Sequence, residues 1–139
     1  MLAVFRAKVS PTRAGVTIRP MELFLNFDFA AARNLPNLPA EHTCARIHGH
    51  TFCVEIVLGG DVGERSGWIM DFANVEDAIE RLKHKVDHQY LNNIEGLDNP
   101  TTELLAMWIW RALKPELPGL EQVKVQEHPS RGVIYSGDD

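Results

Sequence analysis

Three side chains between residues 41 and 52 have the types and the spacing that metal binding or catalysis requires. His48 and His50 are two residues apart, and side chains at that spacing on a β-strand project from the same face. Two imidazoles placed in this way can chelate a borderline metal ion such as zinc. Cys44, four residues earlier, can serve as a further ligand, a nucleophile or a base. A polar strand start beside a buried thiol is the structural alternative, which the pattern alone leaves open.

The pair Asp87–His88 is a second candidate, at the point where a helical pattern ends. A carboxylate beside an imidazole can orient the ring or raise its pKa, which makes a general acid–base pair. Because neighbouring side chains on a helix diverge by about 100°, the two groups need an irregular helix end to meet. The alternative is a histidine that only stabilises the carboxyl end of the helix.

Glu127 is a third candidate, because it shares its parity with Val123 and Val125. If this row faces the core, the carboxylate is buried and needs hydrogen-bond donors. The guanidine-like edge of a ligand would supply two donors in parallel. The alternative is a carboxylate at a strand end, exposed to water or paired with Arg131.

Apolar periodicity predicts the elements that position these groups. Alternation predicts strands over residues 22–31, 48–58, 120–127 and 132–136, with a short strand or lead-in over 66–72. Helical spacing predicts one helix from Asn74 to about Val86, and a second from Thr101 or Thr102 to a point before Pro115. The order strand, strand, helix, helix, strand, strand predicts an α+β fold, in which two helices cover one face of an antiparallel sheet.

Composition and charge exclude several classes of function. The chain has 139 residues, which fits one domain, and its net charge of −5 argues against nucleic acid as a partner. No apolar run approaches the roughly 18 residues that a membrane span needs, so no membrane partner is expected. The two cysteines are nine residues apart, which is no disulfide framework and favours free thiols in a reducing, cytoplasmic compartment.

The first 20 residues differ in charge from the remainder. They contain four arginines or lysines and no acidic residue, which leaves 10 basic and 19 acidic residues in the rest of the chain. We expect residues 1–20 to be a basic leader, either a flexible tail or an upstream extension with the natural start at Met21. Residues 21–139 are then expected to form a single domain.

The motifs, taken in order, resemble the 6-pyruvoyl-tetrahydropterin synthase family, and most closely its bacterial 6-carboxy-5,6,7,8-tetrahydropterin synthase branch, which acts in queuosine biosynthesis. The resemblance extends from Met21 to about Gly137. It is carried by Phe27-x-Phe29-x-Ala31-Ala32, Leu35-Pro36, His42-x-Cys44-x-Arg46-x-His48-Gly49-His50-x-Phe52, Gly67-Trp68-Ile69-x-Asp71-Phe72, Asp87-His88-x-Tyr90-Leu91-Asn92, Asn99-Pro100-Thr101-x-Glu103, and Glu127 with Tyr135 eight residues later.

The resemblance implies a fold, an assembly and a reaction. The fold is the tunnelling fold (T-fold), whose ββααββ subunits form a homo-oligomer, a trimer or hexamer with active sites between subunits. The substrate is the small molecule 7,8-dihydroneopterin triphosphate. The carboxy branch releases acetaldehyde and triphosphate and leaves 6-carboxy-5,6,7,8-tetrahydropterin. Formation of 6-pyruvoyl-tetrahydropterin is the alternative activity within the family.

The resemblance also implies roles for individual residues. A zinc ion would hold the substrate side chain, with His48 and His50 as two of its ligands. Cys44 would be the catalytic thiol, and Asp87 with His88 would complete the proton-transfer groups. Glu127 would anchor the pterin ring by its amino-pyrimidine edge.

Arg33 departs from the family pattern, because the family has a zinc-binding histidine directly after Phe-x-Phe-x-Ala-Ala. Arginine stays protonated and has no lone pair to give to a metal, so we expect substoichiometric zinc. Three outcomes are open. Another group, such as Cys44, His42 or His128, completes a weaker zinc site; the guanidinium replaces the metal charge and binds substrate oxygens; or the chain is a pterin-binding paralogue with altered or lost activity. The other family residues are present, which favours an enzyme.

Overall fold

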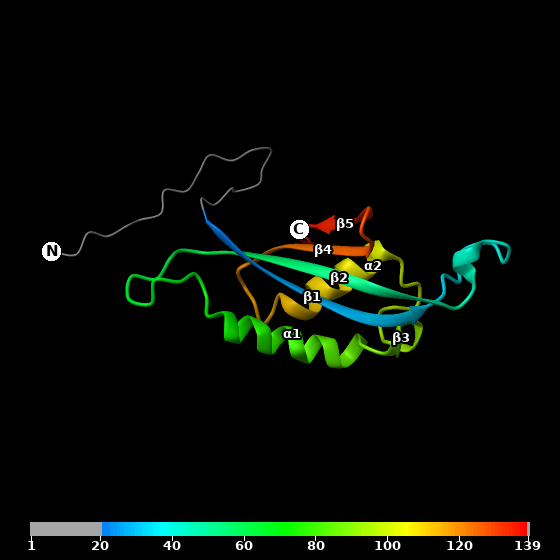
Figure 1. Ribbon diagram of the computed structural model, residues 1–139, viewed down its shortest axis with the longest axis horizontal. Coiled ribbons are helices and arrows are strands. Elements are labelled where there is room, and N and C mark those ends of the chain that lie inside the picture. Colours follow the sequence, from blue (N-terminus) through cyan, green and yellow to red (C-terminus); the bar gives the residue numbers. More distant parts are fainter. Residues whose placement is uncertain (1–20, 139) are drawn as a thin grey trace.

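The computed structural model describes residues 21–138 (Figure 1), so the predicted leader lies outside the described residues. Five strands and two α-helices make up the fold, with two short 3-10 turns. In chain order they are β1 (Glu22–Arg33), η1 (Thr43–Ala45), β2 (His48–Gly59), α1 (Phe72–Val86), β3 (Gln89–Tyr90), η2 (Leu91–Asn93), α2 (Thr102–Leu113), β4 (Leu120–His128) and β5 (Arg131–Tyr135).

The strands form one sheet in the order β3-β1-β2-β4-β5. The pairs β1–β2, β2–β4 and β4–β5 are antiparallel, as predicted, whereas β3 runs parallel to β1. The sheet is therefore mixed, and the prediction of a purely antiparallel sheet is wrong at this edge. A strand of two residues is too short to show apolar alternation, so the pattern could not reveal β3.

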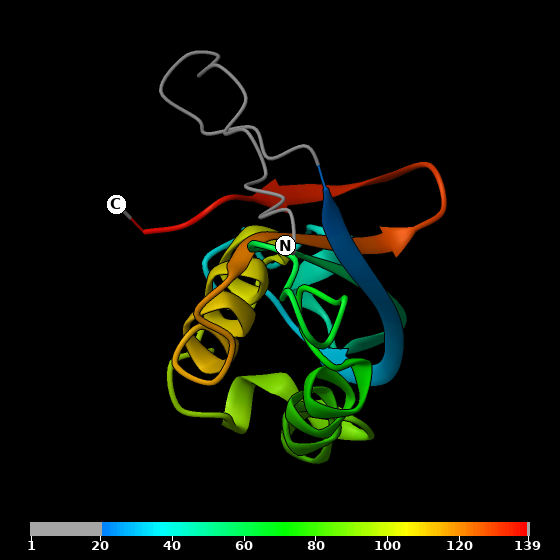
Figure 2. The same ribbon diagram turned by 90° about the vertical axis from the view of Figure 1, so that its left-hand side faces the viewer.

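Both helices cover the same face of the sheet (Figure 2), which confirms the predicted α+β architecture. The apolar parity of the long strands faces the helices, and its central members are almost fully buried: Phe29, Phe52, Val54, Ile56, Val123 and Val125. The helices pack on this face with their own buried apolar stripes, which include Val75, Ile79, Leu82, Leu105 and Ile109. Neither helix of the described chain reaches the length and apolar content that crossing a bilayer requires.

Before α1, the strand alternative for residues 66–72 and the predicted helix cap are wrong, whereas the lead-in alternative agrees with the structure. No strand is found over residues 66–72, because the backbone closes a tight loop instead: Gly63 N–H donates to Trp68 O (2.9 Å) and Gly67 N–H donates to Gly63 O (2.9 Å). Asp71, rather than Asn74, caps α1, and its side chain accepts from Ala73 N–H at 3.0 Å. The helix therefore begins earlier than its apolar stripe.

The β1–β2 register decides which side chains can meet at the end of the sheet. Arg33 pairs with His48, Ala31 with His50, and Phe29 with Phe52. Strand side chains alternate between faces, so this row lies on the helix-covered side with the Phe29 and Phe52 rings, whose centroids are 5.2 Å apart. β1 ends at Arg33, two residues beyond the predicted end, and this extension brings the arginine into the row.

Candidate functional site

The Arg33 guanidinium is buried at the end of β1 and is fixed on several sides. Its Nη1 donates to Pro100 O (3.0 Å) and to Thr102 Oγ1 (3.2 Å), and its Nη2 forms an ion pair with Glu127 Oε2. The guanidinium carbon lies 5.1 Å from the centroid of the Phe52 ring. The side chain is only 3% exposed. A charge buried to this degree requires partners, and here Glu127 supplies the opposite charge.

Glu127 is engaged at both carboxylate oxygens. Oε2 accepts from Arg33 and from Thr102 Oγ1 (3.0 Å), while Oε1 accepts from Arg131 Nε (3.3 Å). Burial raises the pKa of Glu127, but the hydrogen bonds from Thr102 and Arg33, with the Arg33 charge, outweigh it and hold the pKa below its usual range. The predicted row with Val123 and Val125 does face the core. The carboxylate already has donors from its own chain.

The two imidazoles of the histidine pair lie beside this ion pair. His48 Nδ1 lies 2.7 Å from Arg46 O; since a carbonyl oxygen only accepts, Nδ1 donates this hydrogen bond. The Nε2 atom of the same ring is buried and has no hydrogen-bond partner. The ring centroids of His48 and His50 are 4.9 Å apart. Burial, and then the Arg33 charge, lower the pKa of His50, which favours its neutral form.

These residues do not fit a zinc site with three protein ligands. The third position holds the Arg33 cation, and residues 21–138 contain no group of three or more His, Cys, Asp or Glu that could hold a metal ion. Two of the proposed replacement ligands have their Nδ1 atoms in local hydrogen bonds. His42 Nδ1 accepts from Cys44 N–H (3.1 Å), and His128 Nδ1 accepts from Ser130 N–H (3.1 Å). Two lone pairs beside a fixed positive charge are a poor donor set for a divalent cation.

Cys44 lies in η1 as a half-buried free thiol. Its carbonyl accepts from Leu35 N–H (2.8 Å), which ties the turn to the residues that follow β1. A cavity of about 240 Å³ is lined by Cys44 together with Arg33, Glu127 and Arg131. The fold thus brings the predicted thiol and the predicted late carboxylate to one cavity.

Asp87 and His88 meet each other through an irregular helix end, as the pattern required. Asp87 caps α1, and His88 follows with a left-handed φ of 57°. Both residues form hydrogen bonds with the backbone of Ala30: its N–H donates to Asp87 Oδ1 (3.0 Å), and its carbonyl accepts from His88 N–H (2.6 Å). His88 Nδ1 lies 3.0 Å from Asp87 Oδ2, and its side chain is 82% exposed. The Ala30 N–H, and then His88, lower the pKa of Asp87.

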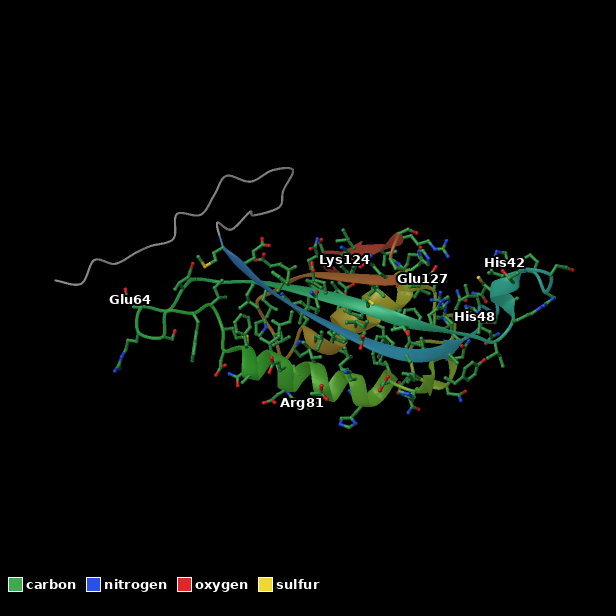
Figure 3. All side chains as sticks on the ribbon, in the orientation of Figure 1. His42, His48, Glu64, Arg81, Lys124 and Glu127 are labelled. Atoms are coloured by element: carbon green, nitrogen blue, oxygen red, sulfur yellow. The ribbon has the colours of Figure 1, made fainter. Side chains whose placement is uncertain are left out.

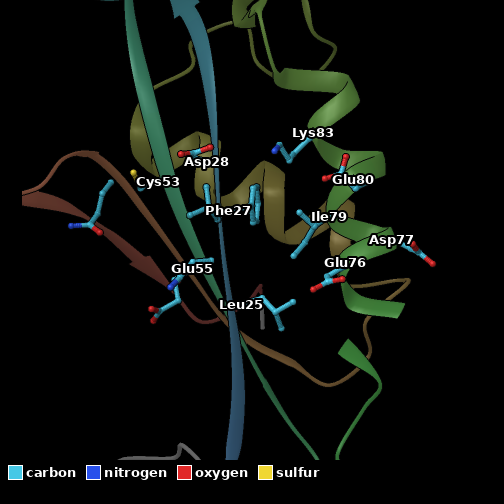
Figure 4. Close-up of a pocket in the computed structure, with 13 residues that line it drawn as sticks. Leu25, Phe27, Asp28, Cys53, Glu55, Glu76, Asp77, Ile79, Glu80 and Lys83 are labelled. Atoms are coloured by element: carbon cyan, nitrogen blue, oxygen red, sulfur yellow. The ribbon is translucent and has the colours of Figure 1, made fainter. Parts of the chain in front are cut away.

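Four of the predicted site residues are divided between two cavities, and His48 and Asp87 line neither of them. His50 and His88 line one of about 550 Å³, whereas Cys44 and Glu127 line the one with Arg33. Glu127, His48 and His42 lie at the same end of the molecule, far from Glu64 (Figure 3). A third, open cavity of about 940 Å³ lies between β1 and α1 and is lined by carboxylates such as Asp28, Glu55 and Glu76 (Figure 4). None of the predicted site residues lines that cavity.

Two positions in the site have roles that the sequence patterns did not reveal. Thr102 is buried and bonds both members of the Arg33–Glu127 pair. Asn92 accepts from Asn34 N–H (3.0 Å) and donates to Asn34 O (2.8 Å), which fixes the chain directly after β1. Both belong to segments that the motifs contain, but only the tertiary arrangement shows which groups they hold.

The architecture and the position of these groups define a class of protein. Two helices on one face of a ββααββ sheet, with polar groups gathered at one end of the strands, is the T-fold arrangement. The solved 6-pyruvoyl tetrahydropterin synthase of Caenorhabditis elegans shares this fold with a TM-score of 0.79, at 24% sequence identity, over 85% of this chain and 96% of that one.

The sequence then gives the family. Residues 22–138 match the family described as 6-pyruvoyl tetrahydropterin synthase, and the chain belongs to this family. It is 37% identical over 119 residues to the 6-carboxy-5,6,7,8-tetrahydropterin synthase of Synechocystis sp., covering 81% of this chain and 91% of the relative. It is 38% identical over 78 residues to the dihydroneopterin monophosphate aldolase of Pyrococcus furiosus, covering 56% of this chain and 65% of the relative.

Proposed function

We propose that this chain is a pterin lyase of the 6-carboxy-5,6,7,8-tetrahydropterin synthase type. It converts 7,8-dihydroneopterin triphosphate and one water molecule to 6-carboxytetrahydropterin, acetaldehyde and triphosphate. The observation that carries the proposal is the common cavity of Cys44 and Glu127 at the end of the strands. The similarity to the Synechocystis enzyme over most of both chains supports the choice of product.

Cys44 is the group that takes a carbon-bound proton from the substrate. A thiolate is a competent base when cationic surroundings favour its ionised form. Arg33 lines the same cavity and supplies positive charge there. We assign the second proton transfer to Asp87 and His88. In one chain His88 borders a different cavity from the one that Cys44 lines, so the complete site would form between subunits of a homo-oligomer.

Glu127 binds the pterin ring through Oε1 in this proposal. Its Oε1 partner, Arg131, is 69% exposed and can turn toward solvent, whereas the Oε2 partner, Arg33, is 3% exposed and held by other groups. The amino-pyrimidine edge would replace Arg131 at Oε1. Binding would then use one carboxylate oxygen, with the second oxygen kept for Arg33.

A non-catalytic pterin-binding protein is the second candidate, and the Arg33–Glu127 ion pair is the observation that favours it. The pair occupies the carboxylate that a pterin would use and places a cation at the third metal-ligand position. Pterin binding without turnover, with turnover gained in Arg33→His, would support this candidate over the lyase.

The test is turnover by the purified full-length protein. Incubation with 7,8-dihydroneopterin triphosphate should release acetaldehyde and give a product with the mass of 6-carboxytetrahydropterin. The product mass separates this reaction from 6-pyruvoyl-tetrahydropterin formation and from an aldolase reaction. Lack of turnover both with and without added zinc would reject the lyase.

A further inference from the structure

The turn that carries Cys44 is tied to the chain after β1 by two hydrogen bonds. Leu35 N–H donates to Cys44 O (2.8 Å), and Asn34 Nδ2 donates to Ala45 O (3.4 Å). Leu35 lines the same cavity as Cys44, so the segment that holds the turn also borders the cavity. Because the Cys44 thiol is half-buried there, its position depends on how firmly the turn is held.

Asn34 is itself held by β3 and η2, the segment that directly follows His88. The Tyr90 hydroxyl donates to Asn34 Oδ1. Asn92 bonds both backbone groups of Asn34: Asn34 N–H donates to Asn92 Oδ1 (3.0 Å), and Asn92 Nδ2 donates to Asn34 O (2.8 Å). The backbone and the side chain of Asn34 are therefore both fixed by groups that lie 56 to 58 residues away in the chain.

The orientation of the Asn34 amide follows from its two side-chain partners. Ala45 O can only accept a hydrogen bond, so the amide nitrogen must face it. The amide oxygen then faces the Tyr90 hydroxyl, which donates. At 3.4 Å the bond to Ala45 is longer than most N–H···O bonds, so a small rotation of the amide would break it. The Tyr90 hydroxyl therefore helps to keep the amide nitrogen on Ala45.

We propose that Asn34, oriented by the Tyr90 hydroxyl, is a positioning residue for the Cys44 thiol. The role of this thiol as a base rests on the proposed function, whereas the hydrogen bonds that hold its turn do not. Without the Tyr90 bond, the amide is free to rotate away from Ala45, and one of the two ties to the turn is lost. The thiol then spends less time at the distance that proton transfer requires, to which reaction rates are sensitive on the scale of about 1 Å.

Tyr90→Phe tests this role in the full-length protein, because the substitution removes the hydroxyl and keeps the ring. The first readout is turnover of 7,8-dihydroneopterin triphosphate. We expect kcat to fall about tenfold while KM stays within about twofold of wild type, because a displaced base affects the reacting geometry more than substrate binding.

The second readout is the rate at which iodoacetamide alkylates each cysteine, followed by the masses of the peptides. Alkylation of Cys44 should become about threefold faster or more in Tyr90→Phe, because the loss of a side-chain hydrogen bond exposes a half-buried thiol more often. Cys53 is an exposed free thiol and serves as the internal standard. Its alkylation rate should be the same in both proteins.

Three further variants control for the substitution itself. Tyr135→Phe removes the hydroxyl of the chain's other tyrosine, which bonds Asp138, and should leave kcat and both alkylation rates unchanged. Asn34→Leu removes both amide bonds at similar size and should reproduce the effects of Tyr90→Phe. The double variant Asn34→Leu/Tyr90→Phe should show no larger effect than the stronger single variant, because both changes act through one amide.

Each contrary outcome has a distinct meaning. A fall in kcat without faster Cys44 alkylation would overturn the proposal, and it would place the effect of Tyr90 in the cavity that this residue lines with His88. Equal acceleration at Cys44 and Cys53, or additive effects in the double variant, would also overturn it. Lack of turnover in wild type would reject the proposed function, while the alkylation rates would still decide whether Asn34 and Tyr90 hold the turn.

Discussion

Arg33 and Glu127 form an ion pair across the end of the sheet, although they are 94 residues apart in the chain. β2 separates their strands in the sheet order, and the arginine lies over Phe52 of that strand. The pair joins two positions to which the family resemblance gives separate roles, a metal ligand and a pterin anchor. In this chain the two roles are coupled through one contact.

The contribution of this pair to stability can be measured by Glu127→Gln. Removal of the charge leaves the buried Arg33 cation without its counter-charge, and we expect a loss of about 2–3 kcal/mol in the free energy of unfolding. Glu116→Gln is the matched control, since it breaks the exposed pair with Arg81 and should cost less than about 1 kcal/mol. Denaturant unfolding of both variants gives the comparison; equal small losses would contradict the role of the pair.

Stability should also depend on pH through Glu127. Its pKa is lowered in the folded protein, so the charged carboxylate stabilises the fold above the unfolded-state pKa, which is about 4.5. This contribution is lost as pH falls through the lower folded-state pKa. The difference in unfolding free energy between wild type and Glu127→Gln should therefore shrink as pH falls below about 4.5. A difference that stays constant from pH 7 to pH 3 would show that Glu127 does not titrate with folding.

The thiol assignment predicts unequal effects of the two cysteines. Cys44→Ala should lower kcat by at least about 100-fold, because a positioned base contributes about this much or more. Cys53→Ala is the matched control, since Cys53 is an exposed free thiol outside the cavity that Cys44 lines. Its kcat should stay within about twofold of wild type. A comparable loss in both variants, or in neither, would remove Cys44 from the proposed mechanism.

A site shared between subunits predicts complementation. Cys44→Ala and His88→Ala should each be inactive alone, because each lacks one proton-transfer group at every site. When the two variants are unfolded together and refolded, some sites will receive Cys44 from one chain and His88 from another. Acetaldehyde release should then return to a fraction of wild type. A mixture as inactive as its components would place both groups in one chain.

The fold could be predicted from the sequence where periodicity is long enough to read. The alternation in β1 and β2 and the stripes of α1 and α2 gave those elements with errors of a few residues at the ends. The two-residue β3 and the loop before α1 could not be obtained in this way, because their structure depends on individual hydrogen bonds.

The sequence motifs predicted which residues belong to the site, but not which of them contact one another. The motifs indicated Cys44, His48 and Glu127, and they identified Arg33 as a departure from the pattern. They did not indicate that Arg33 bonds Glu127, or that Thr102 holds both, because those contacts join β1, α2 and β4. Periodicity describes neighbours along one element, whereas these partners meet only when the sheet and helix have packed.

The metal content of wild type and Arg33→His shows whether an arginine paired with Glu127 occupies the third metal-ligand position. Both proteins are purified in parallel, incubated with zinc, freed of unbound metal and analysed for zinc per subunit. We expect substoichiometric zinc in wild type and about one zinc per subunit in Arg33→His, since three imidazoles provide three ligands of a tetrahedral site that keeps one open position. One tightly held zinc per subunit in the wild type would contradict this expectation.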